Sequence, residues 1–219
     1  MPNHQFIDLS HTIEDGMQTY KGLPAPIICD YFSHEASRQL YAEGTEFQIG
    51  KIEMVANTGT YLDAPFHRYR DGKDLSEIGL EQSAQLDSVL VDATAATAID
   101  THFFHHLDVK GKAVLVRTDW SKHWGTEQYF YHHPFLTEAA AIFLRDAGTT
   151  LVGIDSHNID DTSGNTRPVH TILLGANILI VEHLCNLNQI PMDQPFKFSA
   201  VPPKVKGFGT FPVRAYAMI

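Results

Sequence analysis

Short apolar runs rich in β-branched residues recur along this chain. Four of them have the length of a β-strand and are bounded by turn-forming or polar residues, which is the pattern of strands in a sheet. They cover residues 88–91, 113–116, 151–154 and 178–181. Each run is predicted to form a β-strand.

One segment shows the period of an amphipathic helix, at residues 137–147. Its apolar positions share one face (Ala140, Phe143, Leu144 and Ala147). Thr137 can accept a hydrogen bond as N-cap, and Gly148 stands where a left-handed residue ends a helix. A second, weaker helical pattern covers residues 80–86. The proline-rich residues 191–209 are predicted to form an extended loop.

Predicted strands outnumber predicted helices, so the fold class is mixed α and β. No internal repeat or flexible linker divides the chain, and residues 1–219 are predicted to form a single domain. The charged and apolar fractions, 19% and 43%, are those of an ordinary globular protein. The net charge of −10 argues against nucleic acid as a partner.

Features of export and of membrane insertion are not found in this sequence. The first residues lack a basic segment followed by an apolar one, and the longest apolar stretch, residues 171–181, is too short to span a bilayer. Cys29 and Cys185 are too few for a disulfide framework and are predicted to be buried thiols in a reducing compartment. The protein is therefore predicted to be cytoplasmic and to have no membrane partner.

Histidine is abundant, with 13 residues, and some of them are adjacent in sequence. Neighbouring side chains point in different directions on a helix or a strand, so the pairs His105-His106 and His132-His133 are predicted to lie on the surface or in loops. Only spacing can separate ligands from other histidines.

Polar side chains of several kinds gather in residues 57–67. Tyr61 and Asp63 are two positions apart, so in an extended segment they point the same way, and His67 follows shortly after. Gly59 can adopt backbone angles closed to other residues, and Pro65 stiffens the following turn. Such a segment can direct several polar groups into one pocket. The alternative is a turn in which Asp63 caps backbone N–H groups.

A second pair of candidate residues lies downstream. His170 precedes an apolar run, and Glu182 closes the following one. A carboxylate at the end of a buried strand suits an active site, because functional residues gather at strand ends. The alternative for Glu182 is a rim carboxylate paired with a nearby Lys or Arg.

Other catalytic arrangements are not supported by the sequence. Asp155, Ser156 and His157 are adjacent, which does not make a triad, and neither a G-x-S-x-G elbow nor a phosphate-binding P-loop is present. Cys185 follows an apolar run and is predicted to be a core thiol. Residues 164–167 are predicted to form a turn near the substrate because they come just before His170.

The chain resembles the cyclase family, which includes kynurenine formamidase and isatin hydrolase. The signature of that family is His-x-Gly-Thr-His-x-Asp-x-Pro-x-His, and the chain matches it at five positions: Gly59, Thr60, Asp63, Pro65 and His67. Segments beginning at Asp8, Arg117, Gly153 and Pro203 also resemble the family, so the resemblance covers nearly the whole chain. It implies a swivelling β/β/α domain that assembles into a homodimer or homotetramer, and residues 191–203 are long enough to contribute to the partner contact.

The chain departs from the signature at two positions. The first two signature histidines, which are metal ligands in the family, are Asn57 and Tyr61 here, and both are weaker ligands for zinc or manganese. Asp63, His170 and Glu182 resemble the ligand set of the second metal in two-metal members. The resemblance therefore implies zinc or manganese at these three residues.

The resemblance implies hydrolysis of an amide, lactam or ester bond, most readily a C–N bond, in a small aromatic or cyclic substrate. His67 corresponds to the general acid/base histidine, Tyr61 could hydrogen-bond a developing oxyanion, and Asn57 is expected to contact substrate. A metal would polarise the carbonyl and activate water. Two alternatives stay open: a metal-independent lyase, isomerase or cyclase that uses Tyr61 and His67, and a relative that binds a small ligand without catalysis.

Overall fold

The centre of the molecule is a nine-stranded mixed sheet, in a computed structural model that describes residues 5–192 and 194–219. In the order in which they pair, the strands are β1 (Phe6–Asp8), β13 (Tyr216–Met218), β11 (Phe196–Ser199), β5 (Leu86–Asp92), β7 (Ala113–Arg117), β9 (Leu151–Ile154), β10 (Leu179–Glu182), β4 (Tyr61–Asp63) and β12 (Thr210–Pro212). Strands β5, β7, β9 and β10 are parallel, and the other pairings are antiparallel. All four predicted strands are thus confirmed, with β10 one residue later than predicted.

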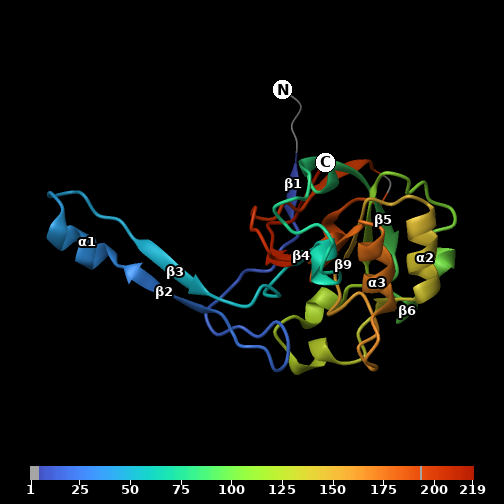
Figure 1. Ribbon diagram of the computed structural model, residues 1–219, viewed down its shortest axis with the longest axis horizontal. Helices are drawn as coiled ribbons and strands as arrows, with labels where there is room; N and C mark the ends of the chain where they lie inside the picture. The colour runs from blue at the N-terminus through green and yellow to red at the C-terminus, as the bar shows by residue number, and fades with distance from the viewer. Residues whose placement is uncertain (1–4, 193) are drawn as a thin grey trace.

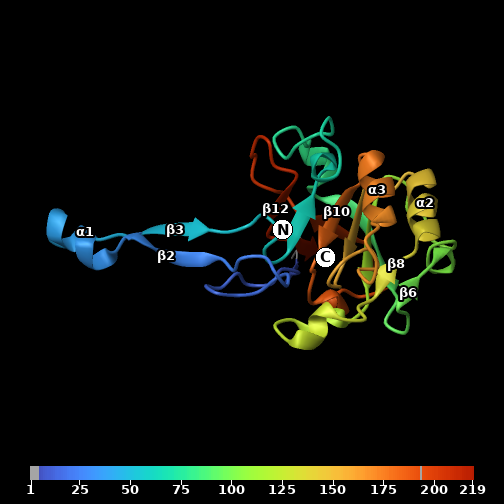
Figure 2. The ribbon, with the colours of Figure 1, turned by 60° about the horizontal axis from the view of Figure 1, so that its bottom comes forward.

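Two helices lie side by side against one face of this sheet, α2 (Glu138–Asp146) and α3 (Pro168–Gly175) (Figures 1 and 2). They enclose one apolar cluster with alternate residues of the parallel strands, such as Val114 and Val152. Residues of opposite orientation, such as Leu115 and Val181, pack in a second cluster on the other face. The mixed α and β class is confirmed.

Helix α2 begins and ends as predicted. The Thr137 side chain accepts a hydrogen bond from the Ala140 N–H, at 3.1 Å, and Gly148 is left-handed at φ +78°. Its fully buried face consists of Ala140, Ala141 and Leu144, whereas Phe143 and Ala147 are only partly buried.

A hairpin arm projects from the body, as Figures 1 and 2 show. It consists of β2 (Ile27–Phe32), β3 (Ile49–Glu53) and helix α1 (His34–Leu40) at its tip. Nearly every residue of the two strands is exposed, on both faces. The arm was not predicted, because strands that bury neither face show no alternating pattern of apolar and polar residues.

Short elements connect the larger ones. Strands β6 (Ala98–Ile99) and β8 (Phe135–Leu136) form a small parallel pair. The 3₁₀ helices are η1 (Pro65–His67), η2 (Leu80–Gln82), η3 (Thr101–Phe103), η4 (Trp120–His123), η5 (Glu127–Phe130) and η6 (Leu187–Gln189). In the part of the chain that the structure describes, no helix is long and apolar enough to cross a membrane.

Two of the predicted elements are wrong. Residues 80–86 form only the short η2, because Gln85 is left-handed at φ +51° and the chain enters β5 at Leu86. The loop predicted at residues 191–209 contains β11, whose Phe198 is buried in the core. The apolar stretch 171–181 is divided between α3 and β10 by a turn at Asn177, where φ is +59°.

One prediction of burial needs correction, and one histidine is more buried than its neighbours. Cys29 is exposed on the arm, whereas Cys185 is buried as predicted, and both thiols are free. His105, His106 and His132 are exposed; His133 lies in a loop, as the prediction allowed, but its side chain is buried, with both ring nitrogens beside polar groups, the Pro134 carbonyl and the Thr162 hydroxyl.

Candidate active site

Strand β4 places Tyr61 and Asp63 on the same face of the sheet, as their spacing predicted. Both residues are buried, and β4 pairs with β10 on one side and β12 on the other. The register sets Glu182 directly opposite Tyr61 and Thr210 directly opposite Asp63. Asp63 therefore belongs to a strand, and the alternative of a capped turn is wrong.

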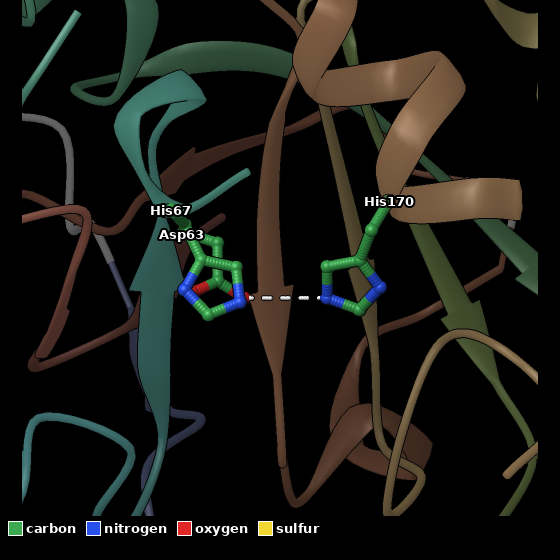
Figure 3. Close-up of side chains that lie close together, drawn as sticks. All are labelled: Asp63, His67 and His170. Atoms are coloured by element: carbon green, nitrogen blue, oxygen red, sulfur yellow. Dashed lines mark ion pairs between the residues drawn. The ribbon is translucent and has the colours of Figure 1, made fainter. Parts of the chain in front are cut away.

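His67 approaches the same place from the end of η1. Its Nδ1 lies 2.8 Å from the Thr210 hydroxyl and 3.6 Å from Oδ1 of Asp63. About a third of the His67 side chain is exposed, in contrast to the buried Asp63. Figure 3 shows the His67 ring and the Asp63 carboxylate on one side, with a dashed ion pair from that carboxylate to His170 on the other. His67 is thus the accessible group of this cluster.

His170 is held in the first turn of α3 by a buried carboxylate. Asp160 accepts hydrogen bonds from the His170 N–H, at 3.0 Å, and lies 2.6 Å from its Nδ1. The other nitrogen, Nε2, lies 3.6 Å from Oδ2 of Asp63 and 3.8 Å from Oε1 of Glu182. Burial by itself would lower the pKa of His170. The hydrogen bond to Asp160 and the carboxylates of Asp63 and Glu182 together outweigh that effect, so that the pKa rises to about 10.

Glu182 ends β10 and is only 1% exposed. Its Oε1 accepts a hydrogen bond from the Ile159 N–H, and its Oε2 accepts one from the Tyr61 hydroxyl, both at 2.6 Å. Burial raises its pKa to about 7, against the opposing positive charge of His170. The alternative of a rim carboxylate paired with Lys or Arg is therefore wrong.

The donor set fits a divalent cation. Oδ2 of Asp63 is buried and has no hydrogen-bond partner among the described residues, and it faces His170 Nε2. Asp63, His67 and His170 each offer one ligand atom, and these three atoms lie within 4.8 Å of one another. Oε1 of Glu182 lies 3.8 Å from Nε2 of His170. Two carboxylates and imidazole nitrogen are ordinary ligands of zinc and manganese.

The two altered signature positions differ in their surroundings. The Tyr61 hydroxyl is 2.9 Å from the hydroxyl of Tyr20 as well as hydrogen-bonded to Glu182. Burial raises the pKa of Tyr61 well above its ordinary value. Asn57 is partly buried in the loop before β4. Neither position supplies an imidazole or a carboxylate.

A cavity of about 340 Å³ opens over these groups. It is lined by Tyr20, Leu23, Asn57, Tyr61, His67, Arg68, Asn158, Thr162, Arg167, His170 and Glu182. Every predicted site residue except Asp63 lines it, and Asp63 is 3.6 Å from ring nitrogens of two lining residues, His67 and His170. The turn predicted near the substrate also contributes, through Arg167.

Sequence reasoning missed several polar residues of the site. Asp160 orients His170, Thr210 contacts both Asp63 and His67, and Asn158 donates a hydrogen bond to the Tyr20 hydroxyl at 2.9 Å. A carboxylate shortly after a buried strand was a signal for Asp160. Thr210 carried no signal of its own.

The chemistries that the sequence disfavoured are also disfavoured by the structure. The Ser156 hydroxyl donates to the Pro134 carbonyl, and Asp155 accepts from the N–H and hydroxyl of Thr118. Neither contacts His157 in a triad. Burial raises the pKa of the Cys185 thiol to about 12, so the nucleophilic thiolate is not formed near neutral pH.

Buried neutral imidazoles predict loss of stability in acid. Burial lowers the pKa of His157 to about 3 and that of His183 well below its ordinary value. Below pH 6.5 these imidazoles bind protons in the unfolded chain but not in the folded one. The free energy of unfolding therefore keeps its full value above pH 6.5 and falls as the pH drops below it. At pH 5 the loss from His157 is about 2 kcal/mol. His170 has a raised pKa and contributes fully below pH 6.5, so it does not cause this loss.

Urea unfolding between pH 7.5 and 5 measures this effect. His157→Phe keeps an aromatic ring against Tyr20 and should flatten the pH dependence of the midpoint, whereas His102→Phe, at an exposed position, should not. Equal slopes in wild type and His157→Phe would contradict the prediction.

Comparison with known proteins agrees with this geometry. A family described as "Putative cyclase" matches residues 7–161, which is more than half of the chain. Kynurenine formamidase from Bacillus cytotoxicus is 27% identical over 216 residues, covering 98% of both chains. A solved structure described as a potential metal-dependent hydrolase with cyclase activity has a TM-score of 0.77 at 27% identity and covers 99% of both chains. Isatin hydrolase A from Labrenzia aggregata shares the fold, with a TM-score of 0.83 at 23% identity over 99% of this chain and 94% of that one.

Proposed function

The chain belongs to the cyclase family, and from that premise we propose that it hydrolyses an amide, lactam or ester bond, most readily a C–N bond, in a small aromatic or cyclic substrate. The observation that carries the proposal is the unpartnered, buried Oδ2 of Asp63 beside His170, with the accessible His67 above it. A relative of similar length, a kynurenine formamidase, supports a C–N bond as the target.

The cation of this proposal is zinc or manganese, held by Asp63, His170 and Glu182. When bound, it supplies a Lewis acid that polarises a carbonyl and lowers the pKa of water. Asp160 accepts the hydrogen bond from Nδ1 of His170, so that Nε2 is the ligand atom once a cation replaces the proton that His170 otherwise carries there. The Tyr61 hydroxyl holds Oε2 of Glu182, so that Oε1 faces His170.

His67 moves the proton in this mechanism. Its imidazole takes a proton from water as the water oxygen bonds to the carbonyl carbon, and it returns that proton to the leaving nitrogen or oxygen as the scissile bond breaks. Tyr61 is the candidate donor to the developing oxyanion, for which its single hydroxyl hydrogen turns away from Oε2 of Glu182. Asn57 is the candidate substrate contact at the cavity wall.

The cavity suits a small substrate with a ring and an acidic group. Tyr20, Leu23 and Tyr61 supply apolar surface, while Arg68 and Arg167 supply positive charge toward a carboxylate. The test is turnover of an aryl formamide, such as formylkynurenine, and of the lactam isatin by the purified protein with zinc or manganese added. Failure to hydrolyse amides, lactams and esters of this size would contradict the proposal.

The proposal takes residues 1–219 as a single cytoplasmic domain. Strand β1 pairs with β13, which joins the two ends of the chain in one sheet, and both cysteines are free thiols, as in a reducing compartment. Its partner is the small substrate, not nucleic acid or a membrane.

A homodimer or homotetramer is part of the same proposal, and the arm is the support for it. A two-stranded hairpin is only marginally stable by itself. A second copy of the chain would bury the exposed apolar side chains of the arm. These are Ile27, Tyr31, Leu40, Tyr41, Ile49 and Ile52.

Sedimentation of the purified protein at micromolar concentration should give a homodimer or homotetramer. Ile52→Asp, on the arm, should shift the distribution toward monomer because it places a charge in an apolar contact. Ile142→Asp, at a partly exposed position of α2, is the matched control and should not. A stable wild-type monomer would contradict this expectation.

A further inference from the structure

The hydroxyl of Thr210 lies between the carboxylate of Asp63 and the ring of His67. Antiparallel pairing of β12 with β4 sets Thr210 directly opposite Asp63, and Thr210 is only 3% exposed. Its Oγ1 donates to Oδ1 of Asp63 and is 2.8 Å from Nδ1 of His67. One buried hydroxyl therefore touches a carboxylate and an imidazole together.

Counting hydrogens in this chain of three groups fixes their direction. A hydroxyl has a single hydrogen, and an ionised carboxylate can only accept one. The Thr210 hydrogen therefore points to Asp63, and the hydroxyl oxygen presents a lone pair to His67. A lone pair at 2.8 Å is a hydrogen bond only if Nδ1 of His67 carries a hydrogen. The other ring nitrogen, Nε2, is then unprotonated.

The backbone holds this arrangement without slack. A Cβ at Gly209, the residue before β12, would lie 2.2 Å from the backbone nitrogen of His67 and 2.4 Å from its Cα. The backbones of Gly209 and η1 are therefore in direct contact. The Gly209 carbonyl also accepts a hydrogen bond from the Ala64 N–H, at 2.7 Å. The next residue, Thr210, is thereby fixed beside the His67 ring.

We propose that Thr210 is a positioning residue, which holds His67 in the tautomer with hydrogen on Nδ1 so that Nε2 is the atom that takes up and returns the proton. The inference rests on the proposed function for the role of His67 as acid and base, but the tautomer itself does not depend on any substrate. Orienting a histidine through a polar partner on its other nitrogen is a general device of catalytic sites.

The tautomer can be read from the nitrogen chemical shifts of the imidazole ring. The experiment uses purified, ¹⁵N-labelled protein with zinc, and His67→Gln identifies the signals of His67 among those of the other histidines. Wild type is expected to show hydrogen on Nδ1 and a free Nε2. Hydrogen on Nε2 of His67 in wild type would overturn the proposal without any variant.

Variants at Thr210 separate positioning from packing. Thr210→Val keeps the shape but removes the acceptor, so the Nδ1 tautomer should lose its dominance and kcat should fall about 10- to 100-fold with little change in KM. Thr210→Ser keeps the hydroxyl and should restore both the tautomer and kcat. An unchanged tautomer in Thr210→Val, or a Thr210→Ser variant as impaired as Thr210→Val, would overturn the proposal. A wild-type Nδ1 tautomer in a protein that hydrolyses none of the test substrates would leave this inference standing and contradict the proposed function instead.

Discussion

His67→Ala is expected to lower turnover by about a hundredfold or more, the usual cost of removing a general acid and base. The side chain is one-third exposed at the cavity, and its polar neighbours are Thr210 and Asp63. Removing it leaves no large void in the core, so the fold should be retained. Steady-state turnover on a substrate that the wild type hydrolyses measures the effect.

The same variant distinguishes two roles for His67. The ring lies close enough to Asp63 and His170 to act as a ligand in addition to Glu182. If His67 is the acid and base, His67→Ala should keep the wild-type metal content while turnover falls. Loss of metal together with turnover would make it a ligand, and unchanged turnover would remove it from the mechanism. His102→Ala, at an exposed position outside the cavity, is the matched control and should change neither quantity.

The buried parallel strands and helix α2 could be predicted because each carries a local signal. Runs such as residues 113–116 and 151–154 are apolar on both faces, as central strands must be when helices and loops cover the sheet. Helix α2 is marked by its cap at Thr137 and by Gly148. Such signals depend on a few neighbouring residues and need no knowledge of the tertiary structure.

The arm and β11 lacked signals of that kind. Strands β2 and β3 are exposed on both faces, so their side chains follow no burial pattern. In β11 the prolines on either side suggested a loop, yet Phe196 and Phe198 are buried because β5 and β13 lie beside them. Long-range pairing determined these strands, and local propensity did not.

The residues of the candidate site also fall into two groups, those with a local signal in the sequence and those without one. Asp63, His67, His170 and Glu182 were found because spacing and a family signature mark them. Thr210 and Asp160 act through contacts to residues that are 147 and 10 positions away in the chain, respectively. A threonine opposite an aspartate becomes visible only when β12 pairs with β4. The groups that orient a site are therefore harder to predict than the groups that react.

Removing the charge of Glu182 is expected to remove most of the bound metal. In Glu182→Gln the amide oxygen can still accept from the Ile159 N–H, and the Tyr61 hydroxyl can rotate to accept from the amide nitrogen, so the local fold should persist. The site, however, loses an anionic ligand beside His170. Elemental analysis after growth with zinc and manganese should find about one ion per chain in wild type and little in the variant. Glu127→Gln makes the same change at an exposed position and should keep the metal.

At the two altered signature positions, substitution can add metal ligands instead of removing one. Asn57→His together with Tyr61→His places two imidazoles beside the existing Asp63 carboxylate, on the wall of the same cavity. Because imidazole binds zinc and manganese far better than an amide or a phenol, the metal content per chain should rise above that of wild type. Wild-type protein that contains no metal after growth with both ions would contradict the cation at Asp63, His170 and Glu182. A metal-independent lyase or isomerase reaction would then be the better interpretation, since Tyr61 and His67 line the cavity together and could exchange protons with a substrate between them.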